Sequence, residues 1–184
     1  MNDIQGWINL YKPRNISSFK ALNKIKKNFE LKKIGHAGTL DPLAEGILPV
    51  AIGNATKIIP FINNSMKTYN FTIAWGAQTS TDDTEGEILF KNTNFPTLNK
   101  IKEKIKNFTG YFQQTPPKVS AVKVNGKRAY KLQRDNQKFE ILPKTVFVKS
   151  LKIINHETTN SSFKIECGKG FYIRSLARDL GIEL

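Results

Sequence analysis

The 184-residue sequence has little cysteine, histidine or acidic charge: one cysteine, Cys167, two histidines, His36 and His156, and 15 acidic residues. A single cysteine excludes a disulfide within the chain, and so few soft ligands exclude an ordinary zinc cluster. No apolar run approaches the roughly 20 residues that a membrane-spanning helix needs, and the first residues lack the pattern of a signal peptide. These absences favour a cytoplasmic protein with metal-free chemistry.

Basic residues are abundant by contrast. Lysine and arginine number 29, which gives a formal net charge of +14. Clustered cations gain affinity for polyanions by releasing counterions, so nucleic acid is the first expected partner and an anionic membrane the second. Lysine greatly outnumbers arginine and asparagine is frequent, so part of the charge could instead reflect the base composition of the gene.

Asp41 lies in a loop between two short apolar stretches. Gly35 and Gly38 permit unusual backbone conformations, and Pro42 fixes its own φ and biases Asp41 towards an extended conformation. Such a loop can aim a carboxylate, which could serve as a nucleophile or a base. An aspartate before proline is also a common turn former or helix cap, and the spacing alone leaves both interpretations open.

Four segments occur in the order of one known family. They are GWINLYKP from Gly6 to Pro13, GHAGTLDPLAEGILP from Gly35 to Pro49, QTPPKVSAVKVNGKRAY from Gln114 to Tyr130, and CGKGFYIRSL from Cys167 to Leu176. Together they resemble the motifs of the TruB family of tRNA pseudouridine synthases. The second segment has every fixed position of that family's catalytic loop.

The resemblance implies an α+β pseudouridine synthase catalytic fold over residues 1–184. A largely antiparallel mixed sheet would be flanked by helices, with an RNA-gripping insertion at about residues 115–145. The implied reaction converts a flipped-out uridine to pseudouridine at position 55, in the TΨC loop of tRNA, without cofactor or metal. The expected partner is the T arm of tRNA, with no membrane and no guide RNA, and a monomer is expected. Family members continue past the position of Leu184, so part of the catalytic domain and the C-terminal RNA-binding domain are expected to be absent.

The same resemblance assigns roles to individual residues. Asp41 would be the catalytic carboxylate, Arg174 the cation that keeps it charged, and Tyr69 the ring that stacks on the target base and could take the C5 proton. The carboxylate would attack C1′ or C6, or remove a ribose proton to give a glycal, and the sequence leaves both routes open. Tyr172 would line the pocket on the same strand face as Arg174. His36 would contact RNA near the extruded nucleotide.

Each of these residues also has a purely structural interpretation. Tyr69 alternates with Phe71, Ile73 and Trp75 along an expected strand, which is typical of a core tyrosine. Arg174 could form a surface ion pair of little energetic value. A lone histidine such as His36 is usually structural.

The insertion carries most of the expected RNA contacts. Lys123, Lys127 and Arg128 would meet phosphates, and Tyr130 among these cations could stack on a base. A solvated charged loop is the alternative. Outside the insertion, Lys12 in the Lys-Pro turn is also expected to bind substrate.

The remaining pattern predicts ordinary elements. Strands are expected at 7–11, 69–75, 87–91, 139–154 and 163–167, and Asn125-Gly126 predicts a hairpin turn. A helix after Ser17 or Ser18 would bury Phe19, Leu22, Ile25 and Phe29. Asn54 would cap a short helix and Thr97 would cap a longer one. A last helix would begin near Ile173.

Two rival functions remain. A non-catalytic tRNA-binding or folding protein derived from this family would keep the basic insertion without turnover. A general binder of nucleic acid or anionic surfaces would need only the charge, but charge does not explain the Asp41 loop.

Overall fold

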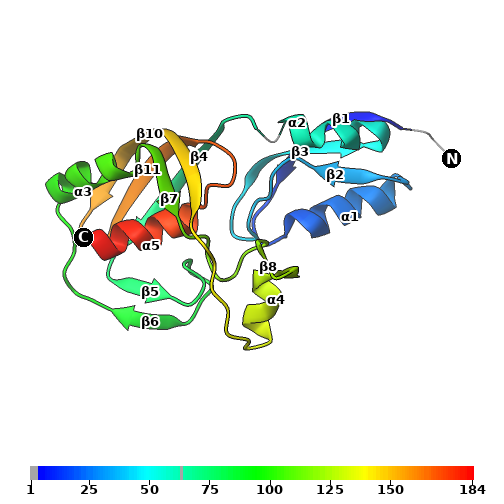
Figure 1. The fold of residues 1–184 in the computed structure, drawn as a ribbon. Coiled ribbons are helices and arrows are strands. Elements are labelled where there is room, and N and C mark those ends of the chain that lie inside the picture. The colour runs from blue at the N-terminus through cyan, green and yellow to red at the C-terminus, as the bar shows by residue number, and fades with distance from the viewer. Residues whose placement is uncertain (1–3, 63) are drawn as a thin grey trace. The chain divides into compact units, whose positions relative to one another are not determined.

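The computed structural model describes residues 4–62 and 64–184, which fold as two compact units divided after Ser65. We call them the N-terminal unit and the C-terminal unit. Every strand pairing described is antiparallel. The mixture of helices and antiparallel sheets in Figure 1 confirms the predicted α+β class.

The N-terminal unit is a three-stranded sheet covered by a helix. Its strands β1 (Gly6–Lys12), β3 (Gly46–Ile52) and β2 (Ile34–His36) lie in the order β1-β3-β2. Helix α1 (Ser18–Asn28) packs Leu22 against Leu48 and Val50 of β3. A 3₁₀ turn, η1 (Gly53–Ile58), and a short helix, α2 (Ile59–Ile62), follow.

Two details of this unit differ from the sequence prediction. Ser17 caps α1 by accepting a hydrogen bond from the Lys20 N–H, as predicted, but Phe19 and Phe29 are 69% and 59% exposed. The buried face consists of Ser18, Ala21 and Leu22; Phe19 is turned about 100° from Ser18 around the helix, and Phe29 is the C-cap residue, beyond the last residue of α1. Asn54 caps nothing: η1 begins at Gly53, and the Asn54 side chain bonds Gln5.

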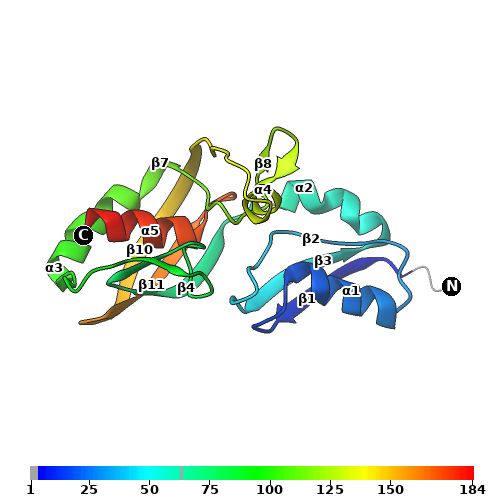
Figure 2. The ribbon, with the colours of Figure 1, turned by 90° about the horizontal axis from the view of Figure 1, so that it is seen from below.

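The C-terminal unit is built on a four-stranded sheet in the order β4-β11-β10-β7. Its strands are β4 (Lys67–Ala74), β7 (Gly110–Gln114), β10 (Lys144–Glu157) and β11 (Asn160–Cys167). One face is covered by α3 (Leu98–Lys104), its 3₁₀ extension η2 (Ile105–Phe108), and α5 (Ile173–Glu183), as Figures 1 and 2 show. The strand predicted at 139–154 corresponds to β10, which starts later than predicted, at Lys144.

Alternation along the strands builds the core beneath these helices. Phe163, Ile165 and Cys167 lie on one face of β11 and are fully buried with Leu176 and Leu180 of α5. Two hairpins complete the unit: β5 (Ala77–Thr79) with β6 (Ile88–Lys91), and β8 (Lys123–Val124) with β9 (Lys127–Arg128). Helix α4 (Ala129–Arg134) follows β9.

Candidate active site

The Asp41 loop connects β2 to β3 and is fixed mainly through its backbone. The Ser18 hydroxyl donates to the Leu40 carbonyl at 2.9 Å and accepts from the Leu40 N–H at 3.0 Å, so the residue before Asp41 is held from both sides. After it, the Pro42 carbonyl accepts from the Asn15 N–H at 2.8 Å, and the Ala44 N–H closes a turn onto the Asp41 carbonyl at 3.1 Å. Asp41 is half-buried within this framework.

Lys12 was expected to bind substrate, but the structure gives it another role. Its side chain is 0% exposed, and its ammonium donates to the carbonyls of Ile16 at 2.7 Å and Ala44 at 2.6 Å. Longer bonds reach the carbonyls of Pro13 and Pro42. Burial lowers the pKa of Lys12, and the negative charges of Asp41 and Glu45 oppose that shift. Lys12 therefore holds the loop that carries Asp41. Because the residue is fully buried, its ammonium is not open to a substrate, and the predicted binding role is replaced by a structural one.

His36 is the last residue of β2, where it pairs with Val50. Its Nδ1 makes a short hydrogen bond to the Gly38 carbonyl, and Gly38 adopts a left-handed φ of 94°. Since a carbonyl oxygen only accepts, Nδ1 is the donor in this bond. His36 thus shapes the start of the loop, a structural contribution that the alternative interpretation of this residue anticipated.

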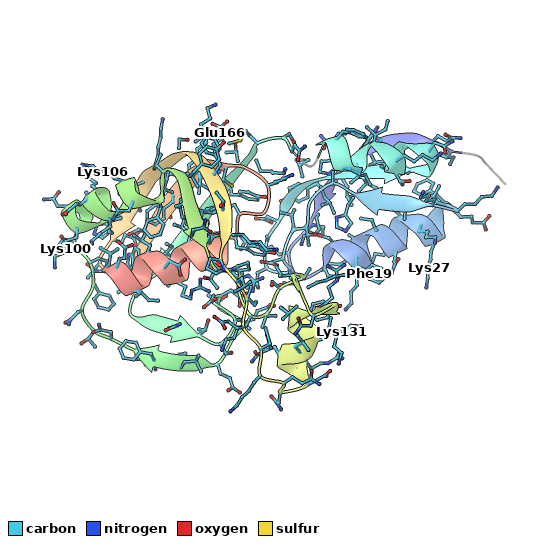
Figure 3. All side chains as sticks on the ribbon, in the orientation of Figure 1. Phe19, Lys27, Lys100, Lys106, Lys131 and Glu166 are labelled. Atoms are coloured by element: carbon cyan, nitrogen blue, oxygen red, sulfur yellow. The ribbon has the colours of Figure 1, made fainter. Side chains whose placement is uncertain are left out.

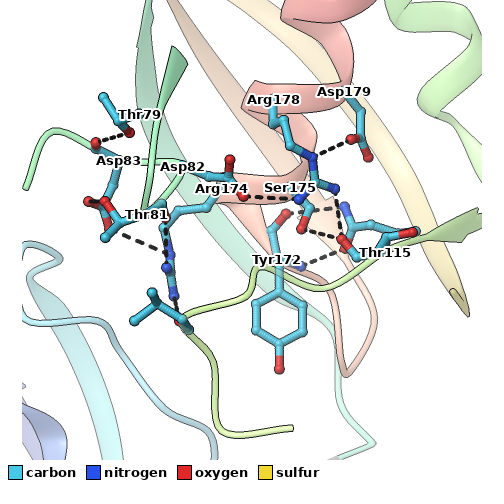
Figure 4. A network of polar contacts seen from close by, with 12 residues as sticks. Thr79, Thr81, Asp82, Asp83, Thr115, Tyr172, Arg174, Ser175, Arg178 and Asp179 are labelled. Carbon is cyan, nitrogen blue, oxygen red and sulfur yellow. Dashed lines mark hydrogen bonds and ion pairs between the residues drawn. The ribbon is translucent and has the colours of Figure 1, made fainter. Parts of the chain in front are cut away.

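Arg174 lies in the first turn of α5, and its side chain is only 12% exposed. Figure 4 shows its guanidinium directed at the turn between β5 and β6: Nη1 donates to the Thr81 carbonyl at 3.0 Å and Nε lies 3.7 Å from Asp83 Oδ2. Nη2 donates to the Val119 carbonyl at 3.1 Å. The alternative interpretation, in which Arg174 forms an ion pair at the surface, is therefore wrong, because the side chain is largely buried. The expected contact with Asp41 joins two different units and stays a prediction.

Tyr172 precedes α5, and its backbone is clamped by Gln114. The Gln114 amide donates to the Tyr172 carbonyl at 3.1 Å and accepts from the Tyr172 N–H at 2.9 Å, with Gln114 only 1% exposed. The predicted shared strand face of Tyr172 and Arg174 is wrong, since the chain turns into a helix at Ile173. Tyr69 lies on β4 opposite Ile165, half-buried against the core of the C-terminal unit.

A second arginine, Arg178, lies one helical turn beyond Arg174 and belongs to the same network, although none of the four sequence motifs includes it. Arg178 donates to Asp82 at 2.9 Å, to Asp179 at 2.8 Å and to the Thr115 carbonyl at 2.8 Å (Figure 4). Burial disfavours its charge, but the two carboxylates outweigh that effect and raise the pKa of Arg178. The sequence signal was the i, i+4 spacing of the two arginines combined with adjacent acids in the β5–β6 turn.

Asp82 completes this network at some conformational cost. Its φ is 58°, in the left-handed region that non-glycine residues rarely adopt. Burial raises the pKa of Asp82 while Arg178 opposes the shift. Strained, buried charged residues concentrate at functional sites, so the β5–β6 turn belongs to the candidate site of the C-terminal unit.

The insertion forms the hairpin that the Asn-Gly pair predicts. Asn125 and Gly126 have φ values of 49° and 81°, as a two-residue turn of this kind requires. The basic residues Lys123, Lys127 and Arg128 are exposed, and Tyr130 is exposed at the start of α4. Ala129 and Leu132 anchor α4 from its buried side.

The described residues contain no group of three or more histidine, cysteine, aspartate or glutamate residues that could hold a metal ion. Across the same ranges, no helix has the length and hydrophobicity to cross a bilayer.

Comparison with known proteins agrees with the motifs. Residues 26–173 match the model of the TruB family pseudouridylate synthase N-terminal domain. The chain belongs to the TruB family. It is 52% identical over 183 residues to tRNA pseudouridine synthase B of Wolbachia pipientis, and 51% identical over 181 residues to that of Ehrlichia chaffeensis. The two alignments include 98% and 97% of this chain, but only 52% and 61% of the two TruB relatives.

Solved structures of the same fold come from larger assemblies. A chain in the crystal structure of a Cbf5-Nop10-Gar1 complex matches 97% of this TruB chain with a TM-score of 0.72 and 28% identity. A chain in an H/ACA ribonucleoprotein bound to a substrate RNA containing 2′-deoxyuridine matches with a TM-score of 0.69 and 26% identity. The chain spans 44% and 43% of these proteins. The comparison therefore confirms the pseudouridine synthase fold only for the part of them that this chain covers.

Proposed function

We propose that this chain carries the catalytic centre of a tRNA pseudouridine synthase that converts uridine 55 of the TΨC loop to pseudouridine. The observation that carries the proposal is the Asp41 loop, whose backbone is fixed on both sides of the carboxylate by Ser18, Asn15 and Lys12. The name of the relatives at about half identity supports tRNA as the substrate class.

Asp41 is the reacting group in this proposal. A rigid loop reduces the reorganisation needed to bring one carboxylate oxygen to the sugar or the base. Whether that oxygen attacks carbon or removes a ribose proton, the uridine must first leave its stack, and the protein must stabilise the opened loop. Arg174 would keep Asp41 ionised, and Tyr69 would stack on the extruded base and could receive the C5 proton.

The other proposed contacts place RNA around this centre. Tyr172, aimed by Gln114, would line the pocket, and His36 would present Nε2 to RNA near the extruded nucleotide. Lys123, Lys127 and Arg128, exposed on the hairpin, would bind phosphates, with Tyr130 as a stacking surface. The reaction needs no cofactor, metal or guide RNA, and one protein chain would bind one T arm.

An activity assay decides between catalysis and binding alone. The protein is incubated with an unmodified tRNA transcript, and pseudouridine is mapped by carbodiimide modification. We expect a single site in the T loop, lost in Asp41→Asn while tRNA binding is retained. Binding without product, under conditions in which a longer TruB relative gives full product, would favour the non-catalytic alternative.

A further inference from the structure

Helix α1 has a charge pattern that the proposed centre does not use. Its sequence, SFKALNKIKKN, contains four lysines and no acid. The buried residues Ser18, Ala21 and Leu22 face the sheet of the N-terminal unit. Figure 3 shows Lys27 and Phe19 projecting from α1 away from that sheet. The exposed face of α1 is therefore strongly positive.

A hollow of about 550 Å³ lies beside this face, formed between α1 and the turn after β1. We call it the α1 hollow. Its polar lining comes from Arg14, Asn15, Lys20, Asn23, Lys24 and Lys27, and none of the acidic residues that the structure describes lines it. All of these residues belong to the N-terminal unit, so the hollow is a property of that unit by itself.

Three of the four cations here have no carboxylate partner in the described part of the chain. Arg14 lies 3.2 Å from Glu45, in a pair exposed on both sides. Lys20, Lys24 and Lys27 form no such pair among the described residues and are exposed. Unpaired lysines at i, i+4 and i+7 repel one another. A bound anion would relieve that repulsion.

The spacing suits a chain of phosphates better than a single small anion. Lys20 and Lys27 are seven residues apart, which is about 10 Å along a helix axis at roughly 1.5 Å per residue. One nucleic acid strand carries a phosphate about every 3.4 Å of its axis. Lysine heads on flexible stems bind such a row as point charges without reading the sequence.

We propose that the α1 hollow binds successive backbone phosphates of a folded RNA, as a second contact surface made of other residues than the basic insertion. The hollow adjoins the Asp41 loop, because Asn15 lines the hollow and its N–H donates to the Pro42 carbonyl at 2.8 Å. That the RNA is the tRNA substrate rests on the proposed function, whereas phosphate binding rests on the hollow itself.

The test compares two triple variants of equal charge change. Lys20→Gln, Lys24→Gln and Lys27→Gln together remove the α1 cations. Lys100→Gln, Lys102→Gln and Lys106→Gln remove three exposed cations of α3 and η2 as the control. Affinity for an unmodified tRNA transcript is measured from 50 to 300 mM KCl, and a thermal melt verifies that each variant is folded.

We expect the α1 variant to bind at least tenfold more weakly and the slope of log K against log salt to fall by about 3, near 1 for each phosphate that is no longer neutralised by a lysine. The α3 variant should shift the slope by less than 1. Arginine at positions 20, 24 and 27 should restore binding. Equal decreases in affinity for the two glutamine variants, or none for the α1 variant, would overturn the proposal, since the lysines would then act only as diffuse charge.

Two further measurements distinguish this proposal from membrane binding and from the proposed catalysis. Vesicles of anionic phospholipid at matched salt serve as the competing surface: binding to vesicles that depends on the α1 lysines, with no decrease for tRNA, would overturn the assignment to RNA. Pseudouridine formation is followed in parallel. An inactive wild-type protein whose tRNA affinity still falls in the α1 variant would contradict the proposed catalysis and support the hollow.

Discussion

The ammonium of Lys12 lies 2.6 Å from the carbonyl oxygen of Ala44, 32 residues further along the chain. This contact links the end of β1 to the far side of the Asp41 loop. Among the described residues no carboxylate forms an ion pair with this ammonium, which is held by backbone carbonyls instead, so its replacement removes a charged donor from several of them.

Replacing Lys12 by methionine is expected to lower the free energy of unfolding by about 2–4 kcal/mol, because buried acceptors lose a charged donor. Chemical denaturation followed by circular dichroism measures the change. The Lys20→Met variant is the control, since Lys20 is exposed and should change stability by less than about 0.5 kcal/mol. A Lys12→Met protein of unchanged stability would show that the loop holds its shape without the ammonium.

The ion pair of Arg178 and Asp82 is expected to couple α5 to the β5–β6 turn. Arg178→Met leaves Asp82 buried without its partner and should cost about 3–5 kcal/mol, as should Asp82→Leu by leaving Arg178 underpaired. The double variant should cost clearly less than the sum of the two. Strict additivity in this double-mutant cycle would mean that the two side chains do not interact energetically.

The hairpin of the insertion is expected to depend on the backbone freedom of Gly126. A Cβ at this position meets no atom of residues 4–62 or 64–184 within 4 Å, so Gly126→Ala introduces backbone strain without a clash against them. With φ at 81°, the cost should be about 1 kcal/mol.

Because the hairpin carries Lys123, Lys127 and Arg128, weaker tRNA binding should accompany the strain in Gly126→Ala, as measured by filter binding. Gly126→Asn should lie between Ala and the wild type, since asparagine tolerates the left-handed region. Equal affinity for all three proteins would argue that the hairpin does not position the cations.

Cys167 should be inert in the folded protein. It is fully buried, and burial raises the pKa of its thiol to about 12. Ellman's reagent at pH 8 is therefore expected to label it only as fast as the C-terminal unit opens, and fully in denaturant. Because the pKa is raised on folding, the stabilising contribution of the protonated thiol is lost as pH rises from about 9 to about 12. Fast labelling under native conditions would contradict the burial.

Sequence reasoning located the elements whose signals are local. The Ser17 and Thr97 caps, the alternation of β4 and the Asn125-Gly126 turn depend on residues within a few positions of one another, and the structure confirms them. The predicted start of β10 is too early: residues 139–143 are not in a strand, and of their apolar side chains Ile141 is buried while Leu142 is exposed, so apolar character alone misplaces the boundary.

The contacts that escaped prediction are those between distant segments. Ser18 with Leu40, Gln114 with Tyr172, and Arg178 with Asp82 are 22, 58 and 96 residues apart. Nothing in a single sequence fixes such partners, since each depends on how strands and helices pack. Lys12 shows the same limit: a lysine beside a proline suggests an exposed turn, and only the fold reveals its burial.

The acceptors around Lys12 are all peptide carbonyls, at positions 13, 16, 42 and 44. Every amino acid supplies such an oxygen, so these hydrogen bonds depend on the path of the main chain and not on the side chains of the four acceptor residues. In a saturation library, Ile16 and Ala44 should accept exchanges that keep the local dihedral angles, while position 12 should admit almost nothing. Substitutions would then be tolerated at the residues that accept these hydrogen bonds and not at the residue that donates them.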